Sequence, residues 1–333
     1  MRTTTARRAA AAALLLGVGA GLAGCSEPVP APRPQQDAQP LPALEEAQVE
    51  RVLTGLEETV AAGDAAQDAA ALAPRVQGAP LALRQAGYAV RTAVPTAPEP
   101  TPLGGEVLLE AVPPAADWPR WFLSVTRASE TAVPQVAVLA QTTARDPYRL
   151  SASATLLPGT TLPVLATEDE LAVPVAPDAA QGLAMSPADA VARYADVLTT
   201  GPASPWAAST ADDIFRQQVL AEADAERTAV GAYFTYAASH TPRPGEVWAL
   251  RTADGGALVV GALDGARSFT PNAPGIRQVL PPEVAALAGR EDAPNGSTVR
   301  TVEVVVLAVP PAGSTEPLRL LAGNRGVVAV EVR

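Results

Sequence analysis

The residues of this chain that could carry acid–base, nucleophilic or metal chemistry are few. It has one histidine, His240, one cysteine, Cys25, and 24 basic residues that are all arginine. Without lysine the chain cannot build a P-loop, a Schiff base or a Ser-x-x-Lys acylating pair. A single histidine excludes paired-histidine zinc sites, and a single cysteine excludes intrachain disulfides and CxxC redox pairs. Most common catalytic machinery is therefore excluded.

The candidate ligand-binding residues are His240 and the aromatic side chains that accompany it. His240 follows Tyr233 and Tyr236 closely in the sequence, and it could serve as a general base or a ligand contact at a pocket mouth. The alternative is a loop or edge histidine without a role, because no GxSxG motif supplies an activated nucleophile. Trp121 and Trp248 complete the candidate set, and ordinary core packing is the alternative for both tryptophans.

Acidic residues cluster at three places, and each could in principle attract a hard cation. No calcium-binding DxDxDG loop accompanies them, so we expect no metal site and no cofactor. Glu222 and Glu226 are four residues apart, with Arg227 adjacent, which predicts a solvent-exposed helix face rather than a cation site.

The first 25 residues predict export and lipidation. A basic segment ending in Arg7 and Arg8 precedes an uncharged run, 9–24, that is too short and too rich in alanine and glycine for a membrane span. Leu22-Ala23-Gly24-Cys25 resembles the lipobox of bacterial lipoproteins. The resemblance implies a signal peptide over 1–24, cleavage between Gly24 and Cys25, and diacylglycerol on the Cys25 sulfur. An ordinary secretory signal is the alternative, and the sequence leaves open whether export is by the Sec or the Tat route.

The segment 25–40 predicts a tether between the anchor and the rest of the chain. It carries five prolines and no apolar periodicity, which is typical of an extended polyproline-II linker. The net charge of −11 becomes −14 once the three arginines of 1–24 are removed. We therefore expect no nucleic-acid binding, and a folded part that stands off the outer face of the plasma membrane.

Hydrophobic spacing and turn residues predict helices followed by strands, twice along the chain. In the first half we expect helices over 44–60 and 80–92 and strands over 121–127, 135–143 and 148–157. After a connection over 158–185, we expect a helix capped by Ser186 that ends at Gly201 and a helix that starts near 209 or 210. Further elements are predicted at 247–252, 257–263, 282–288 (a helix), 299–309 and 326–332.

This order predicts an α+β fold in two domains, 41–175 and 186–333. It resembles the NTF2-like, or cystatin-like, fold, in which helices pack on a curved antiparallel sheet, and the whole chain resembles actinobacterial lipoproteins that carry such domains. The resemblance implies an apolar cavity between helices and sheet that binds small molecules or mediates dimerisation.

The leading functional hypothesis is a lipid-anchored, non-catalytic binding or interaction module of the bacterial envelope. Its expected partners are the membrane, through the lipid, and another envelope protein or a small apolar ligand. One alternative is an enzyme of the isomerase or dehydratase type that uses His240 and a carboxylate in the pocket. Another is an assembly factor, which would have a flat apolar patch and no deep cavity. Whether the folded protein has a deep cavity or a filled core would therefore distinguish the hypotheses.

Overall fold

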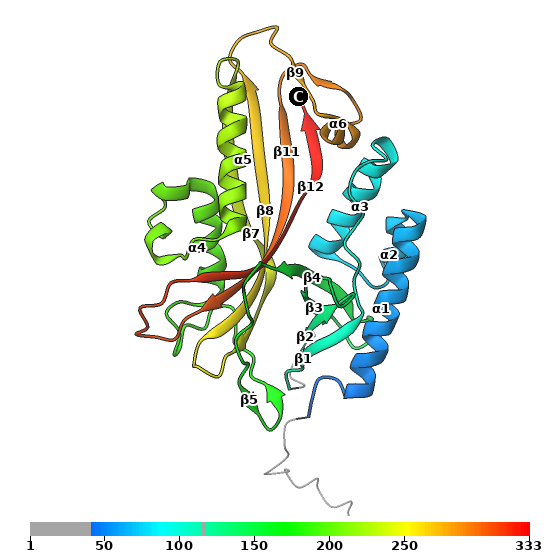
Figure 1. Cartoon of the computed structure of the whole chain (residues 1–333), viewed down its shortest axis with the longest axis vertical. Coiled ribbons are helices and arrows are strands. Elements are labelled where there is room, and N and C mark those ends of the chain that lie inside the picture. The colour runs from blue at the N-terminus through cyan, green and yellow to red at the C-terminus, as the bar shows by residue number, and fades with distance from the viewer. Residues whose placement is uncertain (1–40, 115–117) are drawn as a thin grey trace, which may run out of the picture. The chain divides into compact units, whose positions relative to one another are not determined.

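The strands of both halves of the chain join in one curled antiparallel sheet. The computed structural model describes residues 41–114 and 118–333, which fall in one compact unit. The strand order is β1-β2-β3-β4-β12-β11-β8-β7, so each half contributes a four-stranded meander (Figure 1). The α+β class is confirmed.

The first half consists of three helices and then four strands. Their bounds are α1 Glu46–Ala66, α2 Ala69–Leu72, α3 Gly78–Ala93, β1 Glu106–Ala111, β2 Arg120–Arg127, β3 Gln135–Gln141 and β4 Arg149–Leu156. Both predicted helices and all three predicted strands are present here. A capping box starts α1, in which the backbone N–H of Glu45 donates to the side chain of Gln48 at 2.8 Å.

The second half repeats this order after a short hairpin. The hairpin is β5 Thr167–Glu168 with β6 Leu171–Ala172; the main elements are α4 Pro187–Thr200, α5 Ile214–Val230, β7 Phe234–Arg251, β8 Ala257–Pro271, β11 Ser297–Val309 and β12 Arg319–Val332. Between β8 and β11 lie β9 Gln278–Val279, α6 Pro282–Ala288 and β10 Asp292–Ala293, and α6 confirms the short helix predicted there.

Local capping residues decide where the helices of the second half begin. Ser186 caps α4 as predicted, accepting a hydrogen bond from the backbone N–H of Asp189 at 3.1 Å. The predicted start of the next helix near 209 or 210 is wrong. Asp213 caps α5 instead, accepting from the N–H of Arg216 at 2.7 Å, and a 3-10 turn occupies 207–209.

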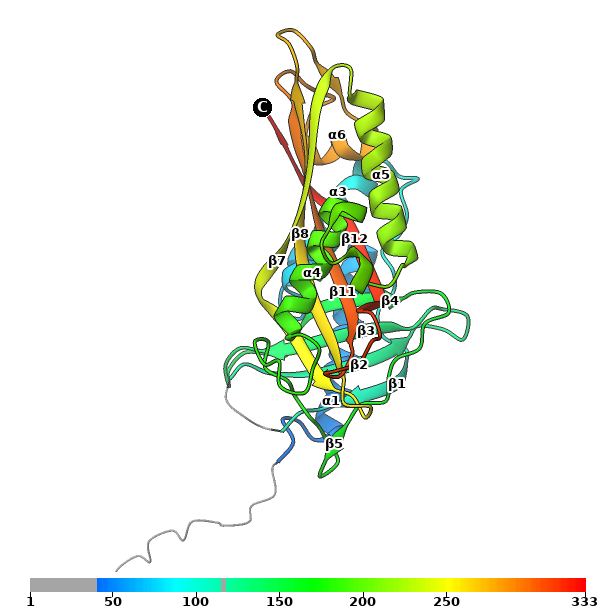
Figure 2. The same ribbon diagram turned by 90° about the vertical axis from the view of Figure 1, so that its left-hand side faces the viewer.

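The two halves of the sheet pack in layers. One apolar core lies between α1–α3 and β2–β4, and a second lies between α4–α5 and β7, β8 and β11. A third core joins the inner face of the first meander to the inner face of the second, and it includes Val136 and Val138 of β3 and Val302 and Val304 of β11. Figure 2 shows the first meander running across the long strands of the second. The layer order is helices, sheet, sheet, helices.

Strand β7 is much longer than the predicted strand at 247–252, because it starts at Phe234. Its first part lies at the edge of the sheet, with alternate residues exposed, so it lacks the apolar run typical of a buried strand. His240 therefore lies on an edge strand, where it pairs with Gly265 of β8.

The lipidation and tether predictions, including Gly24 and Cys25, lie outside the described residues. Within 41–114 and 118–333, no helix is both long and apolar enough to cross a membrane. The chain enters the described unit at the end away from α6 (Figures 1 and 2).

Candidate functional site

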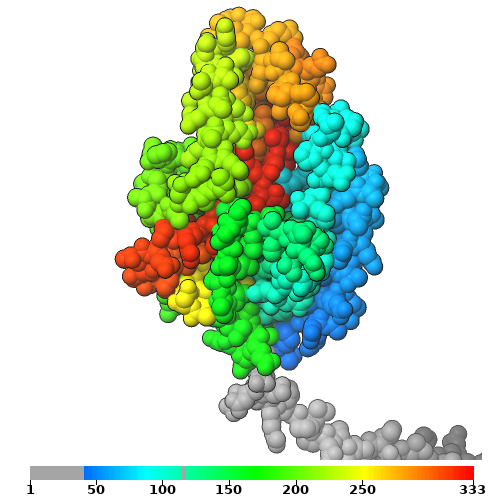
Figure 3. All heavy atoms as spheres, viewed as in Figure 1, coloured from blue at the N-terminus to red at the C-terminus, as the bar shows by residue number. Residues whose placement is uncertain are grey.

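A pocket forms where the two halves of the sheet separate. Strands β4 and β12 pair at only two positions, Leu156 with Ala322 and Thr155 with Gly323. Beyond Gly323 strand β12 continues away from β4, and α3 and α6 both pack against it. Figure 3 shows β12 at the surface between α5 and α3. The space bounded by β4, β12, α3 and α6 is here called the α3–α6 pocket.

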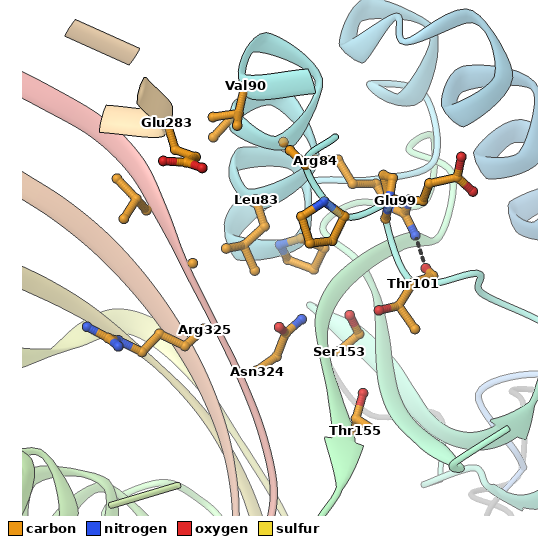
Figure 4. A pocket seen from close by; sticks show the side chains of 18 of the residues that line it. Leu83, Arg84, Val90, Glu99, Thr101, Ser153, Thr155, Glu283, Asn324 and Arg325 are labelled. Atoms are coloured by element: carbon orange, nitrogen blue, oxygen red, sulfur yellow. Dashed lines mark hydrogen bonds between the residues drawn. The ribbon is translucent and has the colours of Figure 1, made fainter. Parts of the chain in front are cut away.

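The α3–α6 pocket has a volume of about 400 Å³, which is within the range of small-molecule sites. Two helices supply most of its apolar wall (Figure 4). The apolar side chains that line it include Leu83, Val90, Leu103, Val284, Leu287 and Val327. The pocket can therefore hold a ligand with an apolar body. The space between these two helices and the sheet is thus an open cavity and not a filled core.

Two glycines shape the pocket. A Cβ atom on Gly326 would lie 2.7 Å from a methyl carbon of Leu83, so the bare backbone lets α3 approach β12 closely. A Cβ atom on Gly87 of α3 would meet nothing within 4 Å, since Gly87 borders the open part of the pocket. Side-chain volume at these two positions thus decides how much room a ligand has.

Polar side chains lie on the pocket floor, where β4 and β12 diverge. Ser153 and Thr155 come from β4 and Asn324 from β12. In Figure 4 the hydrogen bond between the residues drawn joins Arg84 to Thr101, and Ser153, Thr155 and Asn324 are not bonded to one another. Their hydroxyl and amide groups are available to a ligand.

A buried ion pair supports the pocket wall from behind. The guanidinium of Arg84 binds the carboxylate of Asp64 on α1 and donates to the carbonyl oxygen of Thr101 at 2.8 Å. The hydroxyl of Tyr88 also donates to Asp64. Burial, together with this carboxylate, raises the pKa of Tyr88 to about 12. These contacts join α1 and α3 to the loop 94–105, which also lines the pocket.

A second polar cluster lies under α5, on the opposite face of β12. Arg267 of β8 binds Glu222 and Glu226 of α5, each at 2.5 Å, and Arg325 of β12 also binds Glu222. Glu303 of β11 is fully buried and accepts from the hydroxyl of Thr301 at 2.5 Å. The prediction that Glu222 and Glu226 form a solvent-exposed helix face is wrong, because both carboxylates turn toward arginines of the sheet.

The environment of this cluster separates the pKa values of its three carboxyl groups. Burial raises the pKa of Glu303 and of Glu226. Burial also acts on Glu222, but the guanidinium groups of Arg325 and Arg267 outweigh it and lower the pKa of that carboxyl. A cavity of about 260 Å³ adjoins the cluster.

His240 faces this cluster and binds Thr199 of α4. Its Nδ1 lies 3.2 Å from the Thr199 hydroxyl oxygen, and its backbone N–H donates to the same oxygen at 2.8 Å. Burial, and then the charges of Arg325 and Arg267, lower the pKa of His240 to about 4. The imidazole is therefore neutral at physiological pH.

We expect His240→Gln to change how stability depends on pH. As pH falls from 6.5 to about 4, the unfolded chain binds a proton at His240 and the folded protein does not, so the wild type loses stability in this window. Between pH 7 and 4.5 the free energy of unfolding of the wild type should fall by about 2 to 3 kcal/mol more than that of the variant, because the glutamine at position 240 does not titrate. Urea titrations at both pH values measure this. Equal losses in both proteins would contradict the burial of the imidazole.

The predicted aromatic set is divided by the sheet. Tyr236 and His240 lie on the α5 side, where the Tyr236 ring packs against Phe269 with centroids 5.4 Å apart. Trp121 and Trp248 pack against the core between the two meanders. Tyr233 is 60 % exposed. None of the five lines the α3–α6 pocket, as far as the structure describes the chain.

Sequence reasoning named Glu222 and Glu226 of the cluster, but it missed their arginine partners, Glu303 and the residues that form the pocket. A signal was present for Glu303, which is a single carboxylate within the apolar run 302–306 of a strand. A charge at such a position indicates a buried partner. Arg84, Asn324 and the β4 hydroxyls carry no comparable signal, because each is an ordinary polar residue in its local segment.

Comparison with protein families places almost the whole described unit in one family. The model of a family described as a domain of unknown function, DUF8094, matches residues 40–331. The chain belongs to the DUF8094 family. No curated protein and no solved structure matches it. The DUF8094 match begins at residue 40, where the predicted tether ends, and spans both meanders. Within the described part of this DUF8094 chain, no group of three or more His, Cys, Asp or Glu residues could hold a metal ion.

Proposed function

We propose that this protein is a lipid-anchored, non-catalytic binding protein on the outer face of the bacterial plasma membrane. Its ligand is a small molecule whose apolar part occupies the α3–α6 pocket. The observation that carries this proposal is the pocket itself, with a volume of about 400 Å³ and apolar walls from α3 and α6. The anchor and the location rest on the lipobox-like segment that ends at Cys25.

The arrangement of the ionisable groups favours binding over catalysis. His240, which an enzyme of the isomerase type would use as a base, has a hydroxyl as its ring partner and does not line the α3–α6 pocket. The carboxylates of Glu222 and Glu226 are engaged with arginines. An enzymatic role of the α5 cluster is the alternative, and loss of a reaction in His240→Gln without loss of ligand binding would favour it.

We further propose that the two halves are NTF2-like, or cystatin-like, domains joined edge to edge. Apart from the short α6 between β8 and β11, each half places its helices before a four-stranded antiparallel meander, and the last strands of the two meanders, β4 and β12, meet. In an experimental structure, the helices and meander of one half should superpose on those of the other. Unrelated helix placement on the two meanders would contradict this.

Filling the pocket from α3 tests the proposed binding. We expect Gly87→Phe to reduce the affinity for Nile red, an uncharged apolar probe, by at least about tenfold, because the ring would enter open space in the pocket. Fluorescence titration measures the affinity.

The matched control makes the same change on another helix. Gly55→Phe on α1 lies outside the α3–α6 pocket, and its Cβ would meet only the flexible end of Arg75. It should leave Nile red binding unchanged. Equal affinities of the Gly87→Phe variant and the wild type, or no probe binding to the wild type, would overturn the proposed function.

A further inference from the structure

The charged groups around the α3–α6 pocket are arranged so that no cation is left for a ligand among the described residues that line it. Arg84 is buried and binds Asp64 and the Thr101 carbonyl. Arg325 extends to the other side of the β12 ribbon from Asn324, as Figure 4 shows, and there it binds Glu222. An anionic head group would thus enter the pocket without a charged partner.

The rim adds negative charge. Glu283 lies in the first turn of α6 and is exposed, and the side chain of Glu99 is 83 % exposed beside Arg91 at 3.2 Å. Both carboxylates line the pocket, in a chain whose net charge is −11. Arg91 balances the charge of Glu99, so Glu283 and the net charge of the chain are what repel an approaching anion within a Debye length of about 8 Å.

The floor offers uncharged groups instead. Ser153 is buried. Its hydroxyl, the hydroxyl of Thr155 and the amide of Asn324 line the pocket at the point where β4 and β12 diverge. Hydroxyl and amide groups both donate and accept hydrogen bonds. They match a ligand head that does the same without carrying a charge.

From these contacts we infer that the ligand of the α3–α6 pocket is an amphiphile with an uncharged, hydrogen-bonding head and an apolar chain. The head binds Ser153, Thr155 and Asn324 at the floor, and the chain lies between α3 and α6. Fatty acids and anionic lipids are rejected. This inference rests on the proposed binding function and specifies its ligand class.

Three amphiphiles with the same alkyl chain test the inference: a monoacylglycerol, the corresponding fatty acid and the corresponding alkylamine. Each is titrated calorimetrically, below its micelle concentration, against the chain that starts at Ser26. We expect the monoacylglycerol to bind about tenfold more tightly than either charged compound, because Ser153, Thr155 and Asn324 at the floor carry no charge that could pair with a carboxylate or an ammonium group. A fatty acid or an alkylamine that binds as tightly as the monoacylglycerol would overturn the inference and leave the proposed function standing. If none of the three binds and Nile red also fails, the proposed function fails.

Two variants locate the head group. Thr155→Val keeps the side-chain volume and removes the hydroxyl, and Asn324→Leu removes the amide. Each should weaken monoacylglycerol binding by about three- to tenfold and leave Nile red binding in place, since the probe needs only the apolar wall. Thr235→Val, whose hydroxyl binds Asn272 and which does not line the pocket, is the control and should bind both compounds like the wild type. Unchanged monoacylglycerol binding in both pocket variants would overturn the assignment of the head to the floor.

Discussion

Replacing Cys25 with serine is expected to abolish lipid attachment completely. The thiol is the nucleophile that a diacylglycerol transfer would use, and a hydroxyl at the same position is far less nucleophilic. Metabolic labelling with a tagged fatty acid should fall to background in Cys25→Ser. The neighbouring change Ser26→Ala, which keeps the thiol, should label like the wild type.

The energetic consequence of losing the anchor is large. Each buried methylene contributes about 0.8 kcal/mol to membrane binding, so two acyl chains hold a protein durably. The chain that starts at Ser26 carries neither acyl chain and should be recovered in the soluble fraction. The native protein should be recovered with the membranes. An intact mass showing an unmodified Cys25 in an uncut precursor would contradict the anchor and the location proposed from it.

Replacing Asp64 with asparagine is expected to destabilise the protein by about 3 kcal/mol. The change leaves the guanidinium of Arg84, whose side chain is 8 % exposed, without its buried carboxylate. It also replaces one of the two carboxylate oxygens, which together accept from Arg84 and the Tyr88 hydroxyl, by an NH2 group that can only donate. Removing one partner of a buried ion pair costs about 3 to 5 kcal/mol of stability. We expect the lower end of this range, because the side chain of Asp64 is 21 % exposed. Urea denaturation measures the loss, which corresponds to a melting temperature about 5 °C lower.

A surface ion pair provides the control for Asp64→Asn. Asp224 binds Arg227 on α5, but both side chains are more than half exposed, so Asp224→Asn should change stability by less than about 0.5 kcal/mol. If Asp64→Asn costs no more than this control, the pair behind the pocket wall is not buried. Because Arg84 lines the pocket, Asp64→Asn should also weaken Nile red binding, and Asp224→Asn should not.

Much of the fold was predictable because its signals are local. The cap at Ser186, the stop at Gly201 and the apolar spacing of α1 involve residues within one or two turns of each other. The first part of β7 was missed for the converse reason. Its hydrogen-bonding partner is β8, and its exposed edge position removes the apolar alternation that would mark it.

The sequence by itself determined the α+β class, most elements, the scarcity of catalytic residues and the lipobox-like segment at Cys25. Only the tertiary structure decided the site. Asp64 and Arg84 are 20 residues apart, and Glu222 meets Arg325 across 103 residues, so no local pattern reveals these partners. The pocket exists because β12 leaves β4 after two residue pairs and α3 and α6 then pack against it. Such a separation depends on how two distant strands pair, and strand pairing between distant segments is settled by the packing of the whole chain.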